Sequence, residues 1–229
     1  MLTIRYLGHS AFAMNDGTRE VLVDPFLTGN PLAAAKQEEF NPVAILLTHA
    51  HNDHVGDTVT IAKRSGATTV STFELGVYLE SQGVNANYGN HGGTLKFDGG
   101  TAKIVPAWHT SSYSTEHGVV APGVPAGLVV RFGGKTIYFA GDTCLFGDMT
   151  LIGEEGLDIA VIPIGDHFTM GPADAVRALK FLKPGVAIPC HYNTFPPLKQ
   201  DAQAFARDAQ EKAGIKVEVL DPGATYTAE

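Results

Sequence analysis

The chain has 229 residues, 44% of them hydrophobic and 17% charged, which is typical of a globular protein and excludes a disordered or fibrous one. Its net charge of −8 gives no general basic surface for nucleic acid, and its two cysteines cannot form a disulfide framework. The sequence contains neither a basic, apolar leader nor an apolar run of about 18 residues. We therefore expect a single cytoplasmic domain over residues 1–229, without a membrane span.

Short apolar runs and glycine turns predict the elements of the N-terminal half. The run Val43–Leu47 is almost wholly aliphatic, which is typical of a strand covered on both faces. Helices are expected over 55–65 and 73–82, each ending before a glycine. Strands are expected over 3–7, 11–14, 19–23, 43–47, 68–72, 94–97, 101–106, 126–132 and 135–139.

Strands and helices continue to alternate in the second half. Asp158–Ile164 reads as a buried strand, and Pro172 opens a helix that closes at 183–185. A strand over 186–189, a helix over 198–213 and a last strand over 216–220 follow. Strand-rich stretches and βα units in both halves predict a four-layer sandwich, with two mixed β-sheets packed together and helices outside; one doubly wound sheet is the alternative.

The segment Thr48–Asp57, THAHNDHVGD, carries three of the nine histidines within six residues. In an extended segment alternate side chains share a face, so His49, His51 and Asp53 could point one way while His54 diverges. One loop could therefore supply ligands to two neighbouring metal ions. Imidazole and carboxylate suit zinc and, with more carboxylate, manganese or iron. A solvated polar loop is the alternative interpretation.

Further donors follow other predicted strands. Four ligands cannot hold two metal ions and also leave a position open for chemistry, so the chain should supply more. His109 follows IVPAW, Asp142 follows TIYFA, and His191 follows VAIPC. A single such residue is more often structural, but three in the same context favour a shared metal site at the strand ends.

These motifs resemble the metallo-β-lactamase superfamily. The resemblance covers nearly the whole chain and implies an αβ/βα sandwich with a two-metal site at its edge. Its ligand pattern implies one ion held by His49, His51 and His109, a second held by Asp53, His54 and His191, and Asp142 as the bridge. The two ions are expected to be zinc, with manganese as the second choice.

A branch of small bacterial and archaeal metal-dependent hydrolases, similar to ascorbate-6-phosphate lactonase, matches further segments. Many members of that branch have no assigned substrate. The matching segments are YLGHSAF at 6–12, VDPF at 23–26, GDTCLFGDM at 141–149, PIGDHFTMGPADA at 163–175 and PCHYNTFPP at 189–197.

A dinuclear site of this kind predicts hydrolysis. Two divalent ions, two carboxylates and one hydroxide leave a net positive centre, which favours an anionic transition state. Bound water with a pKa near 7 supplies hydroxide at neutral pH. We expect cleavage of a small, anionic ester, lactone or phosphoester, with Asp53 orienting the hydroxide and passing a proton to the leaving group. A homo-oligomer is left open.

Three other functions remain as alternatives. A nuclease acting on RNA or another phosphodiester could carry a similar loop, although the acidic chain argues against a nucleic-acid partner. Redox di-iron proteins of the same fold resemble His-x-Glu-x-Asp, whereas His51 occupies the middle position here. A non-enzymatic metal-binding module would need fewer than seven ligands.

Several polar residues have two interpretations. His9 lies in a Gly-His-Ser turn, where the resemblance favours contact with substrate or leaving group and a capping role is the alternative. Asp24 could support a ligand histidine or form an Asx turn. His167, a candidate catalytic residue, and Thr169 lie between a strand and a helix, where backbone amides could hold an anion; loop residues with no role beyond capping are the alternative.

Two groups near the expected ligands complete the site hypothesis. Tyr192, Asn193 and Thr194 follow His191 and could line the pocket, and a flexible loop at the pocket edge is expected over 110–125. Cys144 and Cys190 are interpreted as small buried residues rather than thiolate ligands.

Overall fold

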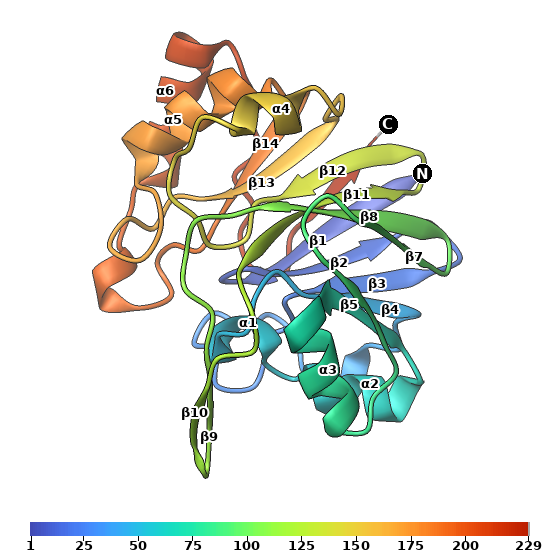
Figure 1. The fold of residues 1–229 in the computed structure, drawn as a ribbon. Helices are drawn as coiled ribbons and strands as arrows, with labels where there is room; N and C mark the ends of the chain where they lie inside the picture. The colour runs from blue at the N-terminus through green and yellow to red at the C-terminus, as the bar shows by residue number, and fades with distance from the viewer. Residues whose placement is uncertain (229) are drawn as a thin grey trace.

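Two mixed β-sheets lie face to face in the computed structural model, which describes residues 1–228 (Figure 1). The first sheet has three parallel pairs at one side, β3–β4, β4–β5 and β5–β6, and antiparallel pairs at the other. Its strands, in spatial order, are β16 (Thr225–Ala228), β1 (Leu2–Gly8), β2 (Ala11–Asn15), β3 (Glu20–Val23), β4 (Ala44–Leu46), β5 (Thr68–Thr72) and β6 (Ala86–Gly89).

The second sheet repeats this plan with the C-terminal half of the chain. Pairs among β12, β13, β14 and β15 are parallel, and the remaining pairs are antiparallel. Its strands, in spatial order, are β15 (Lys216–Val217), β14 (Val186–Cys190), β13 (Ile159–Pro163), β12 (Lys135–Phe139), β11 (Ala126–Phe132), β8 (Gly100–Pro106) and β7 (Thr94–Phe97).

Helices cover the outer face of each sheet (Figure 1). α2 (Thr58–Ser65) and α3 (Phe73–Ser81) pack on the first sheet through a common apolar cluster. α4 (Met149–Gly153), α5 (Pro172–Leu182) and α6 (Ala202–Ala213) pack on the second sheet through another. The short helix α1 (Asn52–Val55) lies at the edge where the two sheets meet. The predicted four-layer sandwich is confirmed.

β4 shows why the aliphatic run of the sequence was informative. Ala44 and Leu46 point into the core between the sheets, whereas Ile45 and Leu47 pack against the helices outside. All four side chains are fully buried. A strand covered on both faces needs apolar residues at every position, and burying each large aliphatic side chain stabilises the fold by about 1.5–3 kcal/mol.

Several predicted boundaries were wrong for local steric reasons. The helix expected over 55–65 is divided at Gly56, where φ is 43° and a Cβ would lie 2.5 Å from Cα of Phe26. The helix expected from 198 begins at Ala202, because Pro196–Leu198 forms a 3-10 turn and the side chain of Asp201 accepts from the amide of Ala204. The strand expected over 216–220 ends at Val217.

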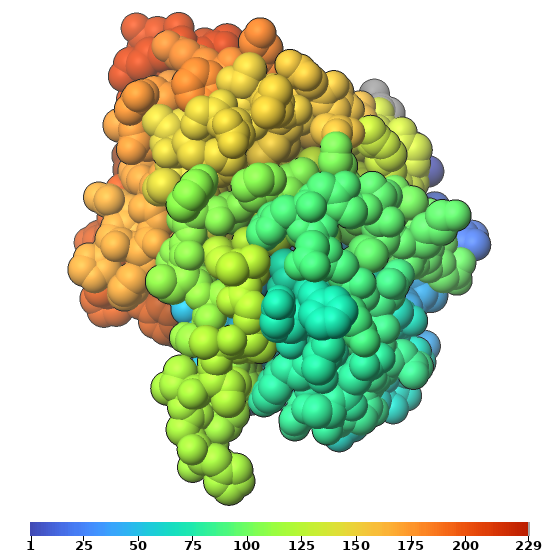
Figure 2. Space-filling view, viewed as in Figure 1, coloured from blue at the N-terminus to red at the C-terminus, as the bar shows by residue number. Residues whose placement is uncertain are grey.

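The expected pocket-edge loop contains an additional hairpin, β9 (Tyr113–Thr115) and β10 (Gly118–Val120). Figure 2 shows this hairpin projecting from the body of the molecule. Another 3-10 turn, Gln37–Glu39, precedes β4. Among residues 1–228, none of the helices is both long and apolar enough to cross a bilayer, and the cellular location stays a prediction.

Candidate metal centre

Six loops bring polar side chains to one edge of the sandwich. Each loop follows the end of a strand, so the strands fix where the loops begin. The loops after β1, β3, β4, β8, β12 and β14 supply, respectively, His9, Asp24, the segment 48–54, His109, Asp142 and His191. The sequence-based expectation that donors at strand ends would converge is therefore met.

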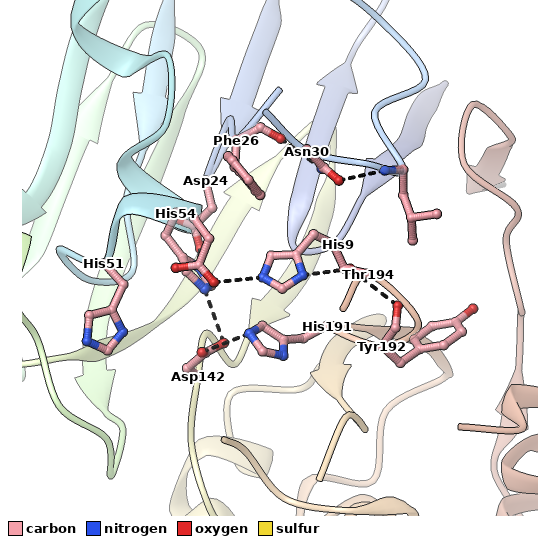
Figure 3. Close-up of polar contacts among 12 residues, drawn as sticks. His9, Asp24, Phe26, Asn30, His51, His54, Asp142, His191, Tyr192 and Thr194 are labelled. Atoms are coloured by element: carbon pink, nitrogen blue, oxygen red, sulfur yellow. Dashed lines mark hydrogen bonds and ion pairs between the residues drawn. The ribbon is translucent and has the colours of Figure 1, made fainter. Parts of the chain in front are cut away.

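Two groups of donor atoms form at this edge, each with its atoms within 4.8 Å of one another. We call the first the outer cluster: His49, His51, His109 and Asp142. We call the second the inner cluster: His9, Asp53, His54 and His191 (Figure 3). The seven residues expected as ligands all belong to these two clusters, and His9 joins them.

The spacing in the outer cluster suits a metal ion. His49 Nε2 lies 3.0 Å from His51 Nδ1, and His109 Nε2 lies 3.5 Å from Asp142 Oδ2. Ligand atoms around a tetrahedral zinc ion, at Zn–N distances of about 2.0–2.1 Å, lie about 3.3 Å apart. Two ring nitrogens at this distance can both bind one cation that lies to the side of the line joining them.

Asp142 lies between the clusters. Its Oδ1 is 3.3 Å from His54 Nε2, and its Oδ2 is 3.0 Å from His191 Nε2. The same Oδ2 is also 3.5 Å from His109 Nε2 in the outer cluster. A carboxylate that faces both groups with both oxygens has the position that a bridging ligand requires.

Asp24 orients two of the histidines. Its Oδ2 accepts from His54 Nδ1 at 2.8 Å and from the hydroxyl of Thr48 at 2.6 Å. The Thr48 oxygen in turn lies 3.0 Å from His49 Nδ1 and can accept its proton. Both rings then keep a proton on Nδ1 and present the Nε2 lone pair to the site. The side chain of Asp24 therefore holds His54, one of the ligand candidates, and accepts from Thr48 rather than forming an Asx turn.

Buried charge shapes the protonation of the site. Burial alone would lower the pKa of His54, but the carboxylates of Asp142 and Asp24 hold that pKa well above its usual value. Burial would raise the pKa of Asp142, but His191 and His54 hold it well below its usual value. For His49, burial and the nearby His54 lower the pKa. A cation entering beside His54 would therefore displace a proton.

Unpaired buried atoms provide a direct test of whether the site fits metal ions. Within residues 1–228, His54 Nε2 and Asp142 Oδ1 are buried and lack a hydrogen bond of good geometry. A buried polar atom without a hydrogen-bond partner costs free energy, so these two atoms are expected to bind a further group. Imidazole and carboxylate are both ligands of divalent cations, and the residues present fit that group.

Backbone strain is concentrated at the same edge. His9, Asp24 and His191 have positive φ values of 59°, 44° and 55°. A non-glycine residue in this region costs of order 1–3 kcal/mol and persists where the surroundings impose it. Each of these residues directly follows a strand; His9 and His191 belong to the inner cluster, and Asp24 binds His54 Nδ1 from behind it, so the strain accompanies their placement.

A cavity of about 340 Å³ opens onto both clusters. Thr110 and Phe168 line it together with ligand candidates; Thr110 lies in the pocket-edge loop expected over 110–125, whereas the sequence reasoning missed Phe168. Phe168 is 54% exposed, and it follows two positive-φ residues, Asp166 and His167. His167 itself is exposed, lies outside the residues that line the cavity, and contacts the ring of Phe168. The lining residues are His51, Asp53, His109, Thr110, Asp142, Phe168 and His191.

His9 is fully buried behind the cavity. Its Nε2 lies 3.0 Å from Asp53 Oδ2, and its Nδ1 lies 2.8 Å from Thr194 Oγ1 (Figure 3). Burial and the neighbouring His191 lower the pKa of His9 to about 4, so the ring is neutral at pH 7. Tyr192 is likewise buried, which corrects the expectation that it and Thr194 line the pocket.

The two cysteines differ. Cys190 is buried in the core between the sheets, as expected, while His191 turns into the site. Cys144 is exposed, which corrects the expectation of a buried residue: it lies in the loop after Asp142 rather than on a strand. Asn193 is also exposed and lines a different cavity, with Phe195 and Lys199.

Known proteins resemble this chain over its whole length. A metal-dependent hydrolase of the UPF0173 group from Thermus thermophilus is 54% identical over 223 residues, which cover 97% of each chain. The solved structure of Igni18, described as a novel metallo hydrolase from the archaeon Ignicoccus hospitalis, has a TM-score of 0.91 at 37% identity and covers 100% of this chain and 98% of that one.

More distant structures share the fold alone. An isothiocyanate hydrolase from Delia radicum gut bacteria has a TM-score of 0.74 at 20% identity, covering 99% of this chain and 98% of that one.

The Beta-lactamase superfamily domain matches residues 19–192, a span that includes every residue of the outer cluster. The chain therefore belongs to the metallo-β-lactamase superfamily and is a metal-dependent hydrolase.

Proposed function

We propose that the chain hydrolyses a small ester, lactone or phosphoester at a pair of divalent cations. The observation that carries the proposal is the position of Asp142 between two donor clusters at one cavity. In this proposal Asp142 bridges the two cations. The remaining ligands are His49, His51 and His109 for one cation, and Asp53, His54 and His191 for the other.

The donor set favours zinc as the native metal, with manganese as the second choice. Five of the seven proposed ligands are imidazoles, which suit zinc, whereas manganese prefers a larger share of carboxylate oxygens. Both sheets supply ligands, since His49 follows β4 and His191 follows β14. We therefore propose that residues 1–229 act as one domain.

Cations held here would acidify water and polarise the bond to be cleaved. The side chain of Asp53 is 33% exposed to the cavity side while its Oδ2 is held by His9. Although burial raises the pKa of Asp53, the hydrogen bond from His9 and the nearby His54 lower it further, so the carboxylate stays ionised. In this proposal the ionised Asp53 orients the water that the cations acidify, and the proton of that water passes along Asp53 to the leaving group.

The cavity favours a small substrate. Its volume of about 340 Å³ lies at the lower end of ligand pockets. Among residues 1–228, the lining includes neither Lys nor Arg, so the attraction for an anionic substrate would come from the cations. Phe168 provides the apolar wall, and we propose that the exposed His167 contacts a substrate group that extends beyond Phe168.

Metal analysis followed by a substrate panel tests this function. Protein purified without chelator is expected to carry about two ions per chain and to hydrolyse at least one of a phosphodiester, a lactone or a thioester. Activity should disappear with a chelator and return with zinc or manganese. A chain with fewer than one ion, or turnover that resists the chelator, would overturn the proposal. Selective cleavage of RNA at low salt would establish the nuclease alternative instead.

A further inference from the structure

We propose that His9 is a positioning residue, which holds Asp53 as the middle member of a buried chain of hydrogen bonds, Thr194–His9–Asp53. The inference rests on the proposed function, because Asp53 is one of its ligands. The two bonds measure 2.8 Å, between Thr194 Oγ1 and His9 Nδ1, and 3.0 Å, between His9 Nε2 and Asp53 Oδ2. They join residues 185 and 44 positions apart in the sequence.

The three hydrogen-bonding groups Thr194, His9 and Asp53 can donate and accept in one direction, from Thr194 towards Asp53. An ionised Asp53 has no proton to donate, so His9 must donate from Nε2. A neutral imidazole then has a lone pair at Nδ1, and the hydroxyl of Thr194 must donate to it. The other acceptor near that hydroxyl, the carbonyl of Tyr192, lies farther away at 3.4 Å. The tautomer of His9 is therefore fixed by its neighbours.

Because the His9 ring is buried, it can position Asp53 but cannot contact a substrate. The side chain of His9 is 0% exposed, and both ring nitrogens have partners. The rings of Phe26 and Phe195 stand against it, with centroids 5.9 Å and 5.6 Å away. A substrate in the cavity meets Asp53, whereas His9 lies behind it and can act only through it.

The backbone of His9 is tied to the inner cluster as well. Its carbonyl accepts from the amide of His191 at 2.7 Å and from the hydroxyl of Tyr6 at 3.2 Å. The turn at His9 therefore places one ligand candidate, His191, through its backbone and a second, Asp53, through its side chain. His9 therefore takes one lone pair of Asp53 Oδ2, and the remaining lone pairs of the carboxylate stay available to a cation and to water.

Two substitutions of His9 can test its Nε2 and Nδ1 hydrogen bonds separately. In His9→Gln the side-chain amide can reach the position of Nε2 and donate to Asp53. In His9→Asn the shorter amide can reach only the position of Nδ1, next to Thr194, and asparagine tolerates the positive φ at this position. Thr194→Val removes the far bond, and Thr69→Val is the matched control, because it removes a hydrogen bond from a buried threonine in β5, to the carbonyl of Asn85.

The first test needs no metal. Histidine ¹⁵N NMR of the metal-free wild-type chain is expected to show His9 as the tautomer with a proton on Nε2, and Thr194→Val should shift the Nδ1 resonance. A proton on Nδ1 instead would overturn the inference. This readout does not depend on catalysis or on cations, so it judges the role of His9 even if the proposed function fails.

The second test is titration with Co²⁺, followed by calorimetry and visible absorption. His9→Asn should lower the affinity of one of the two sites by about 10–100-fold and change its spectrum, as loss of a partner to a ligand does. His9→Gln should restore affinity to within a few-fold, Thr194→Val should fall between them, and Thr69→Val should match the wild type. A His9→Asn chain that binds two Co²⁺ as the wild type does would overturn the inference. Equal loss in both His9 variants would also overturn it, since it would indicate a direct ligand.

Discussion

In the inner cluster, two of the proposed ligands are each held by another buried side chain: Asp24 holds His54, and His9 holds Asp53. In the outer cluster one proposed ligand, His49, has such a buried partner. The hydroxyl of Thr48 lies beside His49, and His51 Nε2 lies 3.4 Å from Thr110. The two clusters therefore contain the same kinds of donor atom but differ in how many of these donors have a buried side-chain partner.

This difference suggests that the two clusters bind their cations with different affinity. Side chains with a second partner keep their orientation when the cation leaves, whereas rings without one must be ordered again on binding. His51 and His109 line the cavity, as do Asp53 and His191 of the inner cluster, so contact with the cavity does not distinguish the two clusters. Because more of its donors have a buried side-chain partner, we expect the inner cluster to bind its cation more tightly and the outer cluster to exchange its cation more readily.

The largest effect should come from the residue that the two clusters share. Asp142→Ala removes the carboxylate between them, so both cations should be lost and turnover should fall by at least about 10³-fold. Metal content and activity of the purified variant measure this, with Asp174→Ala as control, since Asp174 pairs with Arg177 on the surface of α5. Full turnover in the Asp142 variant would contradict the bridging role.

Replacing Asp24 should affect the two clusters unequally. In Asp24→Asn the bond to His54 Nδ1 loses its charge, and the affinity of the inner cluster should fall by about 10–100-fold. Thr110→Val is the matched change at the outer cluster, where the contact with His51 is longer, and it should cost less than about 3-fold. Calorimetric titration with zinc measures both sites. Equal losses in the two variants would remove the distinction between the clusters.

Proton release provides a smaller but direct comparison. The carboxylates around His54 raise its pKa, so that ring is protonated at pH 7 without a cation, and binding must displace the proton. In the outer cluster, burial lowers the pKa of His51 and of His109, and these rings bind without releasing one. Inner-cluster affinity should therefore fall about tenfold for each unit that pH drops, while outer-cluster affinity changes less. Calorimetry in two buffers of different ionisation enthalpy counts the protons.

Sequence alone singled out the ligand candidates that form the two clusters, because their signals are local. Alternation along an extended loop, and a polar residue after an apolar strand, are both visible in a short stretch of residues. The support for these ligands was harder to foresee. For Asp24 the sequence left open whether it supports an unnamed histidine or forms an Asx turn, and the link from Thr194 to His9 depends on how two distant loops pack.

The fold was predictable to a similar degree. Strands buried on both faces, such as β4, have a strong aliphatic signal, whereas β16 has the polar sequence TYTA and was missed. Pairing with β1 in the folded sheet, rather than its own composition, makes β16 a strand. The break at Gly56 likewise depends on the close approach of Phe26, which no local pattern reveals.

The wall of the cavity offers the mildest perturbation. Phe168 lines the cavity, and His167, which was a candidate site residue in the sequence, lies beside it and exposed. Phe168→Ala removes apolar contact worth of order 1 kcal/mol, so KM should rise about 5-fold for a substrate with an aromatic leaving group. The rise should be smaller for a methyl ester, and metal content should not change.

His167→Ala is the matched comparison at the neighbouring position. If His167 contacts substrate beyond Phe168, this variant should raise KM by a few-fold with kcat unchanged, since it removes uniform binding rather than a contact made only in the transition state. A fall in kcat with KM unchanged would give His167 a role in the chemical step. Wild-type kinetics in His167→Ala, together with a raised KM in Phe168→Ala, would assign the rim of the cavity to the aromatic ring, because the turn then serves to present Phe168.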